Sequence, residues 1–364
     1  MTHPSRGCTP SHRLSMQQLG WTKEHADAFS KYTGPYRAGR VACRQKTVWE
    51  VLTGEGLVTT GLSGALKKLG HVPAVGDFVV LYSHPGSGGA MIVDILPRIS
   101  SFTRGAAGRE GTDQVIAANV NIVFIVTAAG HDLNARRIER YLSIAHASKA
   151  QPVILVNKAD LAEDPDRLAD GIVPVAAGIP ILALSAKSGE GIGQLDPYLS
   201  PGTTIVLIGS SGVGKSTLIN RLLDKPVQDI SDTRDYDGKG RHTTTVRQLF
   251  VLKTGALMID NPGLREVGMG TASGGIAETF PDILRVAGDC RFSDCQHDQE
   301  PGCAVKDAVQ RGELSSARVE NYLRLVRELA FEQDKAEIGL ARTERKRWKA
   351  IGKLGKEIQK GRWE

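Results

Sequence analysis

The segment from Gly209 to Ser216 constrains the fold of this chain most strongly. It reads Gly-Ser-Ser-Gly-Val-Gly-Lys-Ser and fits the pattern G-x-x-x-x-G-K-[ST] of a phosphate-binding loop. An apolar, β-branched run at 204–208 precedes it, and a run compatible with a helix follows at 217–223. Glycines in such a strand–loop–helix unit let backbone N–H groups surround phosphates at the positive end of the helix. The segment predicts a nucleoside triphosphate site; a chance glycine-rich turn is the alternative.

The loop residues have separate predicted tasks. Lys215 is expected to reach the β- and γ-phosphates as a catalytic group, and Ser216 to bind Mg²⁺. The loop by itself specifies neither the base nor the reaction. The predicted nucleotide contacts from this segment are Gly209, Ser210, Ser211, Gly212, Val213, Gly214, Lys215, Ser216 and Thr217.

A motif upstream of the loop specifies guanine. Asn157-Lys158-Ala159-Asp160 follows an apolar run at 153–156 and has the form N-K-x-D. Asp160 would accept hydrogen bonds from guanine N1–H and the exocyclic amine, a donor pair that adenine lacks, so ATP would be penalised. Lys158 would lie along the base, and Asn157 would brace the loop.

A second motif supports the same base. Ser185, Ala186 and Lys187 follow the apolar run 179–184 and match the backbone segment that contacts guanine O6 in GTPases. An N-K-x-D sequence arises often by chance. Its place at a strand end, with Ser-Ala-Lys after the next strand, makes chance the weaker explanation.

The remaining nucleotide contacts are expected downstream of the loop. Asp260, at the end of the apolar run 256–259, would hold Mg²⁺ through water. The N–H of Gly263 would contact the γ-phosphate. Within Gly-Arg-His-Thr-Thr-Thr at 240–245, Thr244 is expected to complete the Mg²⁺ shell and to serve catalysis. A plain polar turn is the alternative.

The residue that orients the attacking water is not obvious. Many GTPases place Gln directly after the Asp-x-x-Gly turn, but this chain has Leu264, which cannot polarise water. We therefore expect slow intrinsic hydrolysis, with a partner completing the site. His242 is the candidate nearest in sequence for positioning water; holding the loop or contacting RNA is the alternative.

The order of the motifs is informative. Most GTPases begin with the phosphate loop and end with the guanine motifs, whereas here the guanine motifs come first. The same sheet can be built with the chain cut elsewhere, because sheet termini often lie close together. The chain is thus predicted to be a circularly permuted GTPase, in which the segment 260–263 leads directly into the C-terminal region.

At 364 residues, the chain is longer than a single hydrophobic core supports. We expect a multi-domain α/β protein: an N-terminal OB-type β-barrel, a circularly permuted P-loop GTPase domain, and a mostly helical C-terminal zinc-binding domain. Short β-rich runs between glycines indicate the barrel, although a purely structural β-domain fits as well. A short helix within 14–29 competes with a disordered tail. The predicted boundaries are 1–33 (tail), 34–100 (barrel), 101–275 (GTPase), 276–335 (zinc-binding) and 336–364 (basic tail).

A cluster near the C-terminus predicts a metal site. Cys290, Cys295, His297 and Cys303 supply three thiolates and one imidazole, the donor set of a closed structural zinc ion. A closed site leaves no position for a catalytic water, so the ion is assigned to folding. Reduced structural cysteines are the alternative.

The net charge of +6 is a local feature. Residues 342–362 contain nine Lys and Arg and two Glu, so the remainder is slightly acidic. We predict contacts with rRNA phosphates from a group of basic residues around Trp348, namely Arg345, Lys346, Arg347, Lys349 and Lys353. A solvated arm is the alternative.

No apolar run is long enough for a membrane span or, in residues 1–20, a signal peptide. We expect a cytoplasmic monomer with no membrane partner.

Together, these residues resemble the ribosome small-subunit-dependent GTPase A family (RsgA/YjeQ). The resemblance covers about 34–350 and is carried by the permuted order, by 240–245, and by the run from 290 to 303. It implies a GTPase with Mg²⁺ and one structural Zn²⁺, stimulated by the small ribosomal subunit during late maturation of that subunit. Two departures are Asn261 in place of the usual Thr, and no basic cluster before Tyr32.

Other functions remained compatible with these motifs. One is an rRNA-binding assembly factor in which hydrolysis serves only release. Another is a permuted GTPase that acts on the large subunit; the barrel-like segment and the cysteine spacing argue against it.

Overall fold

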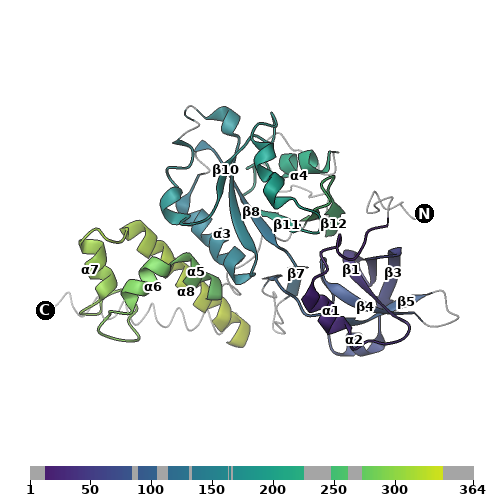
Figure 1. Cartoon of the computed structure of the whole chain (residues 1–364). Coiled ribbons are helices and arrows are strands. Elements are labelled where there is room, and N and C mark those ends of the chain that lie inside the picture. Colours follow the sequence, from purple (N-terminus) through teal and green to yellow (C-terminus); the bar gives the residue numbers. More distant parts are fainter. Residues whose placement is uncertain are drawn as a thin grey trace, which may run out of the picture.

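The computed structural model describes residues 13–83, 89–104, 114–130, 133–162, 164, 167–224, 247–260 and 273–338. Figure 1 shows an α/β part, with the barrel and the C-terminal helices on different sides of it. No helix among the described residues is long and apolar enough to cross a membrane.

The N-terminal barrel has five strands. They are β1 (Tyr36–Gln45), β2 (Val48–Thr53), β3 (Gly56–Leu62), β4 (Phe78–Ser83) and β5 (Ala90–Ile95), with the short helix α2 (Gly64–Lys68) after β3. They pair in the order β1-β2-β3-β5-β4, and β1 also pairs with β4, which closes the barrel. Branched and aromatic side chains such as Val41, Trp49 and Ile92 fill its interior. This confirms the expected barrel.

The α/β part is a mostly parallel sheet. Its strands run in the order β10-β9-β8-β11-β13-β12, and only β12 is antiparallel to its neighbour. Since parallel strands end at the same edge, the loops after them meet there, where α/β proteins bind ligands. The strands are β8 (Ile122–Ala128), β9 (Gln151–Asn157), β10 (Ile181–Ala183), β11 (Thr204–Ile208), β12 (Gln248–Val251) and β13 (Leu257–Asp260).

Within the described residues, two helices follow strands of this sheet. Helix α3 (Ala135–Ala147) follows β8, and α4 (Lys215–Leu223) follows β11. Short 3₁₀ segments at Ala159–Leu161, Val173–Val175 and Ile192–Tyr198 lie in the connections around β10. Strands and helices therefore alternate along this part of the chain, as in the expected α/β domain.

The barrel and the α/β sheet are continuous. Strand β1 pairs with β12 at Cys43 and Gln248, so that one sheet of 11 strands runs through both parts. A separate pair, β6 (Ser101–Arg104) and β7 (Gln114–Ala118), connects the barrel to β8.

Residues 13–33 are not a loose tail. They contain helix α1 (Lys23–Phe29), and Leu19 and His25 are fully buried. Trp21 packs edge-on against Phe78 of the barrel, with ring centroids 5.1 Å apart. The expectation of disorder is wrong for these residues because their apolar side chains join the large core cluster that contains Phe78 and Val80 of β4, and the alternative short helix is observed.

The C-terminal described region is helical, as expected. It comprises α5 (Ser273–Thr279), α6 (Pro281–Ala287), α7 (Ala304–Gln310) and α8 (Ser316–Ile338). Helix α5 lies very close to α3, because a Cβ on Gly275 would stand 1.8 Å from the carbonyl oxygen of Ser143. Only glycine permits that approach.

Candidate functional site

The phosphate-type loop leaves the carboxyl end of β11 and enters α4. Gly209, Gly212 and Gly214 have φ angles of 146°, 83° and 95°, which favour glycine. A Cβ on Gly209 would also lie 2.1 Å from the carbonyl oxygen of Val126 in β8. The backbone path therefore requires glycine where the sequence pattern has it.

Lys215 is held by the loop that precedes it. Its side chain is buried, and Nζ donates to the carbonyl oxygen of Gly209 at 2.8 Å and to that of Ser210. Ser216 and Thr217 lie in the first turn of α4. Ser211 and Gly212 are exposed, so the loop presents its open side to solvent.

Asn157 connects three of the predicted motifs. It is buried at the end of β9. Its Nδ2 donates to the carbonyl oxygen of Val213 in the loop (2.7 Å), and its Oδ1 accepts from the N–H of Ala186 (2.8 Å). A Cβ on Gly214 would lie 2.2 Å from that Nδ2. One amide thus fixes the spacing of the three segments.

The predicted base-reading residues lie beside this amide. Lys158 has a left-handed backbone (φ 62°) and leads into the 3₁₀ segment that carries Asp160. The Asp160 side chain is exposed, so it is accessible to a ligand. Ser185 is fully buried and accepts from the N–H of Ser188 at 3.1 Å, while Lys187 is exposed.

Two arginines were missed by the sequence motifs. Arg221, on α4, donates to the carbonyl oxygens of Ala186 and Lys187, at 2.6 Å each. Arg137, on α3, donates to Ser210 Oγ at 2.8 Å. No motif marks either residue, since each acts through a contact with a segment distant in the sequence.

Asp260 ends β13, the strand beside β11. Several other predicted residues cannot be placed. His242, Thr244, Asn261, Gly263, Leu264 and the basic residues 345–353 lie outside the described residues. Their assigned roles stay predictions.

The cysteine and histidine cluster is assembled. One ligand atom each from Cys290, Cys295, His297 and Cys303 lies within 4.8 Å of the other three. Nδ1 of His297 is 3.6 Å from Sγ of Cys290 and 3.5 Å from Sγ of Cys303. Burial lowers the pKa of His297, which favours the neutral imidazole that metals bind. Three sulfurs and one nitrogen fit a tetrahedral zinc ion.

Glu300 shapes the connection within this cluster. Its carboxylate accepts N–H groups of Gln296, Asp298 and Gln299 at 3.0–3.1 Å. Backbone N–H groups, that of Glu300 itself first and then that of Gln296, lower the pKa of Glu300. The three bonds hold the chain around His297 in a tight turn.

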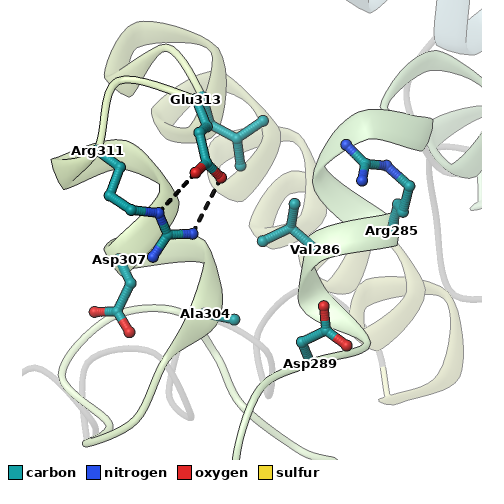
Figure 2. Close-up of a pocket in the computed structure, with 8 residues that line it drawn as sticks. Arg285, Val286, Asp289, Ala304, Asp307, Arg311 and Glu313 are labelled. Carbon is teal, nitrogen blue, oxygen red and sulfur yellow. Dashed lines mark hydrogen bonds and ion pairs between the residues drawn. The ribbon is translucent and has the colours of Figure 1, made fainter.

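A cavity of about 250 Å³ lies beside this cluster, between α6 and α7. Figure 2 shows its charged lining and the ion pair between Arg311 and Glu313. It contains none of the predicted nucleotide contacts. Its lining residues are Arg285, Val286, Asp289, Ala304, Asp307, Arg311, Glu313 and Leu314.

The strand order and the glycine loop define a circularly permuted P-loop GTPase. Residues 95–270 match the model of a family described as RsgA GTPase. A relative from Methanosarcina acetivorans is 52% identical over 94% of this chain and 92% of its own length. The chain belongs to the RsgA GTPase family and is a hydrolase acting on GTP.

Further comparisons agree. A relative from Opitutus terrae is 43% identical over 96% of this chain and all of its own length. The crystal structure of YjeQ from Thermotoga maritima has a TM-score of 0.61 at 29% identity, over 81% of this chain and 99% of that one. YloQ, a circularly permuted GTPase, is similar in fold, with a TM-score of 0.57 at 23% identity, over 81% of this chain and 95% of that one.

Proposed function

We propose that this chain hydrolyses GTP in the late maturation of the small ribosomal subunit, and that the subunit stimulates hydrolysis. The observation that carries the proposal is the single amide of Asn157, which joins the glycine loop to both guanine-type motifs. The relatives from M. acetivorans and O. terrae are both named small ribosomal subunit biogenesis GTPase RsgA.

Within the site, the phosphate loop and Lys215 bind the phosphates, and Asp160 selects guanine. Ser216 and Thr244 hold Mg²⁺, with Asp260 contacting it through water. The two carbonyl contacts of Lys215 support its role, because they hold its ammonium group at the loop that would surround the phosphates. Preorganised charge of this kind is where phosphoryl-transfer enzymes gain most of their rate.

The other assignments complete the proposal. One Zn²⁺ bound by Cys290, Cys295, His297 and Cys303 stabilises the C-terminal region, supported by the geometry of the four donors. The protein works as a cytoplasmic monomer, and its basic C-terminal segment contacts rRNA. His242 positions the attacking water.

The guanine assignment is tested by Asp160→Asn. An amide cannot accept both guanine donors, so GTP affinity is expected to fall by about 100-fold or more, while xanthosine triphosphate binding improves. Equal GTP affinity in the variant would remove Asp160 from the base site.

The catalytic assignment is tested by His242→Ala. It is expected to retain GTP affinity and to lose turnover stimulated by the small subunit. Unchanged stimulated turnover would exclude His242 from water positioning.

A further inference from the structure

Helix α3 contacts the nucleotide loop through one side chain and the C-terminal helix through its neighbours. Arg137 donates to Ser210 Oγ in the loop at 2.8 Å. On the next face of the same helix, Arg136 pairs with Glu320 at 3.0 Å and Arg140 with Glu328 at 2.6 Å, both on α8. Figure 1 shows α3 between the sheet and helices α5 and α8.

The contact on the loop side reaches the phosphate-binding lysine. Arg137 binds the side chain of Ser210, and the carbonyl oxygen of Ser210 accepts from Nζ of Lys215. A shift of Arg137 therefore moves the backbone group that orients Lys215.

The contact on the α8 side is buried and charged. Glu139 of α3 is 1% exposed and contacts Arg318 and Asn321 of α8. Arg318 also binds Asp282 of α6, with Nε 2.8 Å from Oδ2. Asn321 Nδ2 further donates to the backbone carbonyl of Arg136, at 3.3 Å.

These contacts hold α8 in one position against α3, and we call α8 seated when they are made. A buried ion pair adds little net stability compared with an apolar contact, but breaking it costs several kcal/mol because a charge is left unpaired. The network therefore favours α8 either fully seated on α3 or well separated from it. Burial raises the pKa of Glu139, which accords with a carboxylate that depends on its partners for ionisation.

We infer that Arg137 is a positioning residue that couples the phosphate loop to the seating of α8 on α3. When α8 is seated, α3 is fixed, Arg137 holds Ser210, and the loop binds guanine nucleotide more tightly. Coupling free energies are reciprocal, so a bound nucleotide strengthens the seating of α8 by the same factor. A macromolecule that pulls α8 away would thereby weaken nucleotide binding. The inference rests on the proposed function, since it assumes that the loop takes GTP and GDP.

The test is a charge-swap cycle read out by the affinity for fluorescent GDP and a fluorescent non-hydrolysable GTP analogue. Arg140→Glu opposes Glu328 and is expected to weaken nucleotide affinity about fivefold, the lower end of common coupling factors. The double variant Arg140→Glu with Glu328→Arg restores the ion pair and the affinity. Glu328→Gln removes the ion pair without introducing repulsion. It replaces Arg140→Glu in the test if Arg140→Glu lowers the midpoint temperature of thermal unfolding.

Arg137 is tested in the same series. Arg137→Gln is expected to weaken nucleotide affinity about as much as Arg140→Glu does. Adding Arg140→Glu to Arg137→Gln should cause no further loss, because the contact between α3 and Ser210 is already removed. Arg137→Lys keeps a donor for Ser210 and is expected to retain most of the affinity. Arg37→Gln removes an ion pair with Glu55 on the barrel and is the matched control, with no change expected.

The outcomes separate the two claims. If the unmodified protein binds no guanine nucleotide, the proposed function is wrong. If it binds normally but Arg140→Glu and Glu328→Gln leave affinity unchanged, the coupling is wrong. Independent effects that multiply in the variant combining Arg137→Gln and Arg140→Glu would also contradict it.

Discussion

At the scale of single residues, Asn157 determines how the loops of the site are spaced. Its amide satisfies a carbonyl of the phosphate loop and an N–H of the segment 185–187 in a buried position. Buried groups that lose such partners are left unsatisfied at a cost of about 1–3 kcal/mol. Its main effect is therefore on the distance between the phosphate and base subsites.

We expect Asn157→Ala to weaken GDP affinity by about 10- to 100-fold, since the lost contacts hold together two parts of one ligand site. Titration with a fluorescent GDP measures it. Lys187→Ala, on an exposed side chain of the same segment, is the control, for which we expect a smaller loss. Equal losses in both variants would show that Asn157 has no special bridging role.

His25 should make stability depend on pH. Burial lowers its pKa from the ordinary 6.5, and the nearby Arg40 cation acts in the same direction. A depressed folded-state pKa gives stability that is present above pH 6.5 and is lost as the pH falls through the folded-state pKa. Its contribution changes by at most about 1.4 kcal/mol per pH unit.

Urea unfolding between pH 7.5 and 5.5 checks this. His25→Gln keeps an acceptor for the N–H of Thr22, which His25 Nδ1 binds at 3.3 Å, but does not titrate. The variant is expected to lose less unfolding free energy than the unmodified protein over this range. Parallel pH profiles would contradict the assignment.

At the scale of elements, local pattern predicted the long strands and helices well. The apolar runs 153–156 and 204–208 lie in β9 and β11, and the helix-compatible run 217–223 lies in α4. Four strands were missed: β3, β6, β7 and β12. Strand β3 starts at Gly56 and contains Gly61, while β6 and β12 have only four residues each. Their strand character comes from pairing with distant segments, which periodicity does not record.

The site residues also divide into those marked by local sequence and those defined by contacts with distant segments. Gly209, Asn157 and Cys290 belong to motifs whose spacing is local, so the sequence alone indicated them. Arg137 and Arg221 act across the fold, on segments 73 and 34–35 residues away. Only the three-dimensional packing identifies such contacts.

The cluster of Cys290, Cys295, His297 and Cys303 is the proposed zinc site. We expect one zinc ion per chain by metal analysis, and a strong chelator should expose 290–303 to protease because metal binding supplies folding free energy there. Cys295→Ser should lose the ion. Cys43→Ala changes a cysteine outside this cluster and should keep it. Full metal content in Cys295→Ser would contradict the ligand assignment.

At the scale of the whole molecule, Arg40 joins the barrel to the GTPase sheet. Its fully buried guanidinium donates to the carbonyl oxygens of Leu19 (2.6 Å), Gly76 (3.1 Å) and Asn119 (2.9 Å) and to Thr204 Oγ1 (2.8 Å). Burial lowers its pKa to about 9, so it stays charged at neutral pH. Thr204 begins the strand that ends at the phosphate loop, so Arg40 links the barrel to that strand.

Arg40→Met should therefore lower the free energy of unfolding by about 3 kcal/mol or more, because it leaves several buried acceptors without a donor. The exposed pair between Arg37 and Glu55 provides the control: Arg37→Gln should cost less than about 1 kcal/mol. Denaturant unfolding measures both. A small loss in Arg40→Met would mean that the junction relies on apolar packing alone.

At the scale of the whole assembly, we propose that the nucleotide site of this chain binds GTP but needs the small ribosomal subunit for rapid hydrolysis. The most direct measurement is steady-state GTP hydrolysis by the purified protein alone, with purified small subunits, and with large subunits. We predict slow turnover alone and with large subunits, and a clear acceleration with small subunits. Equal rates in all three, or acceleration by large subunits instead, would contradict the account.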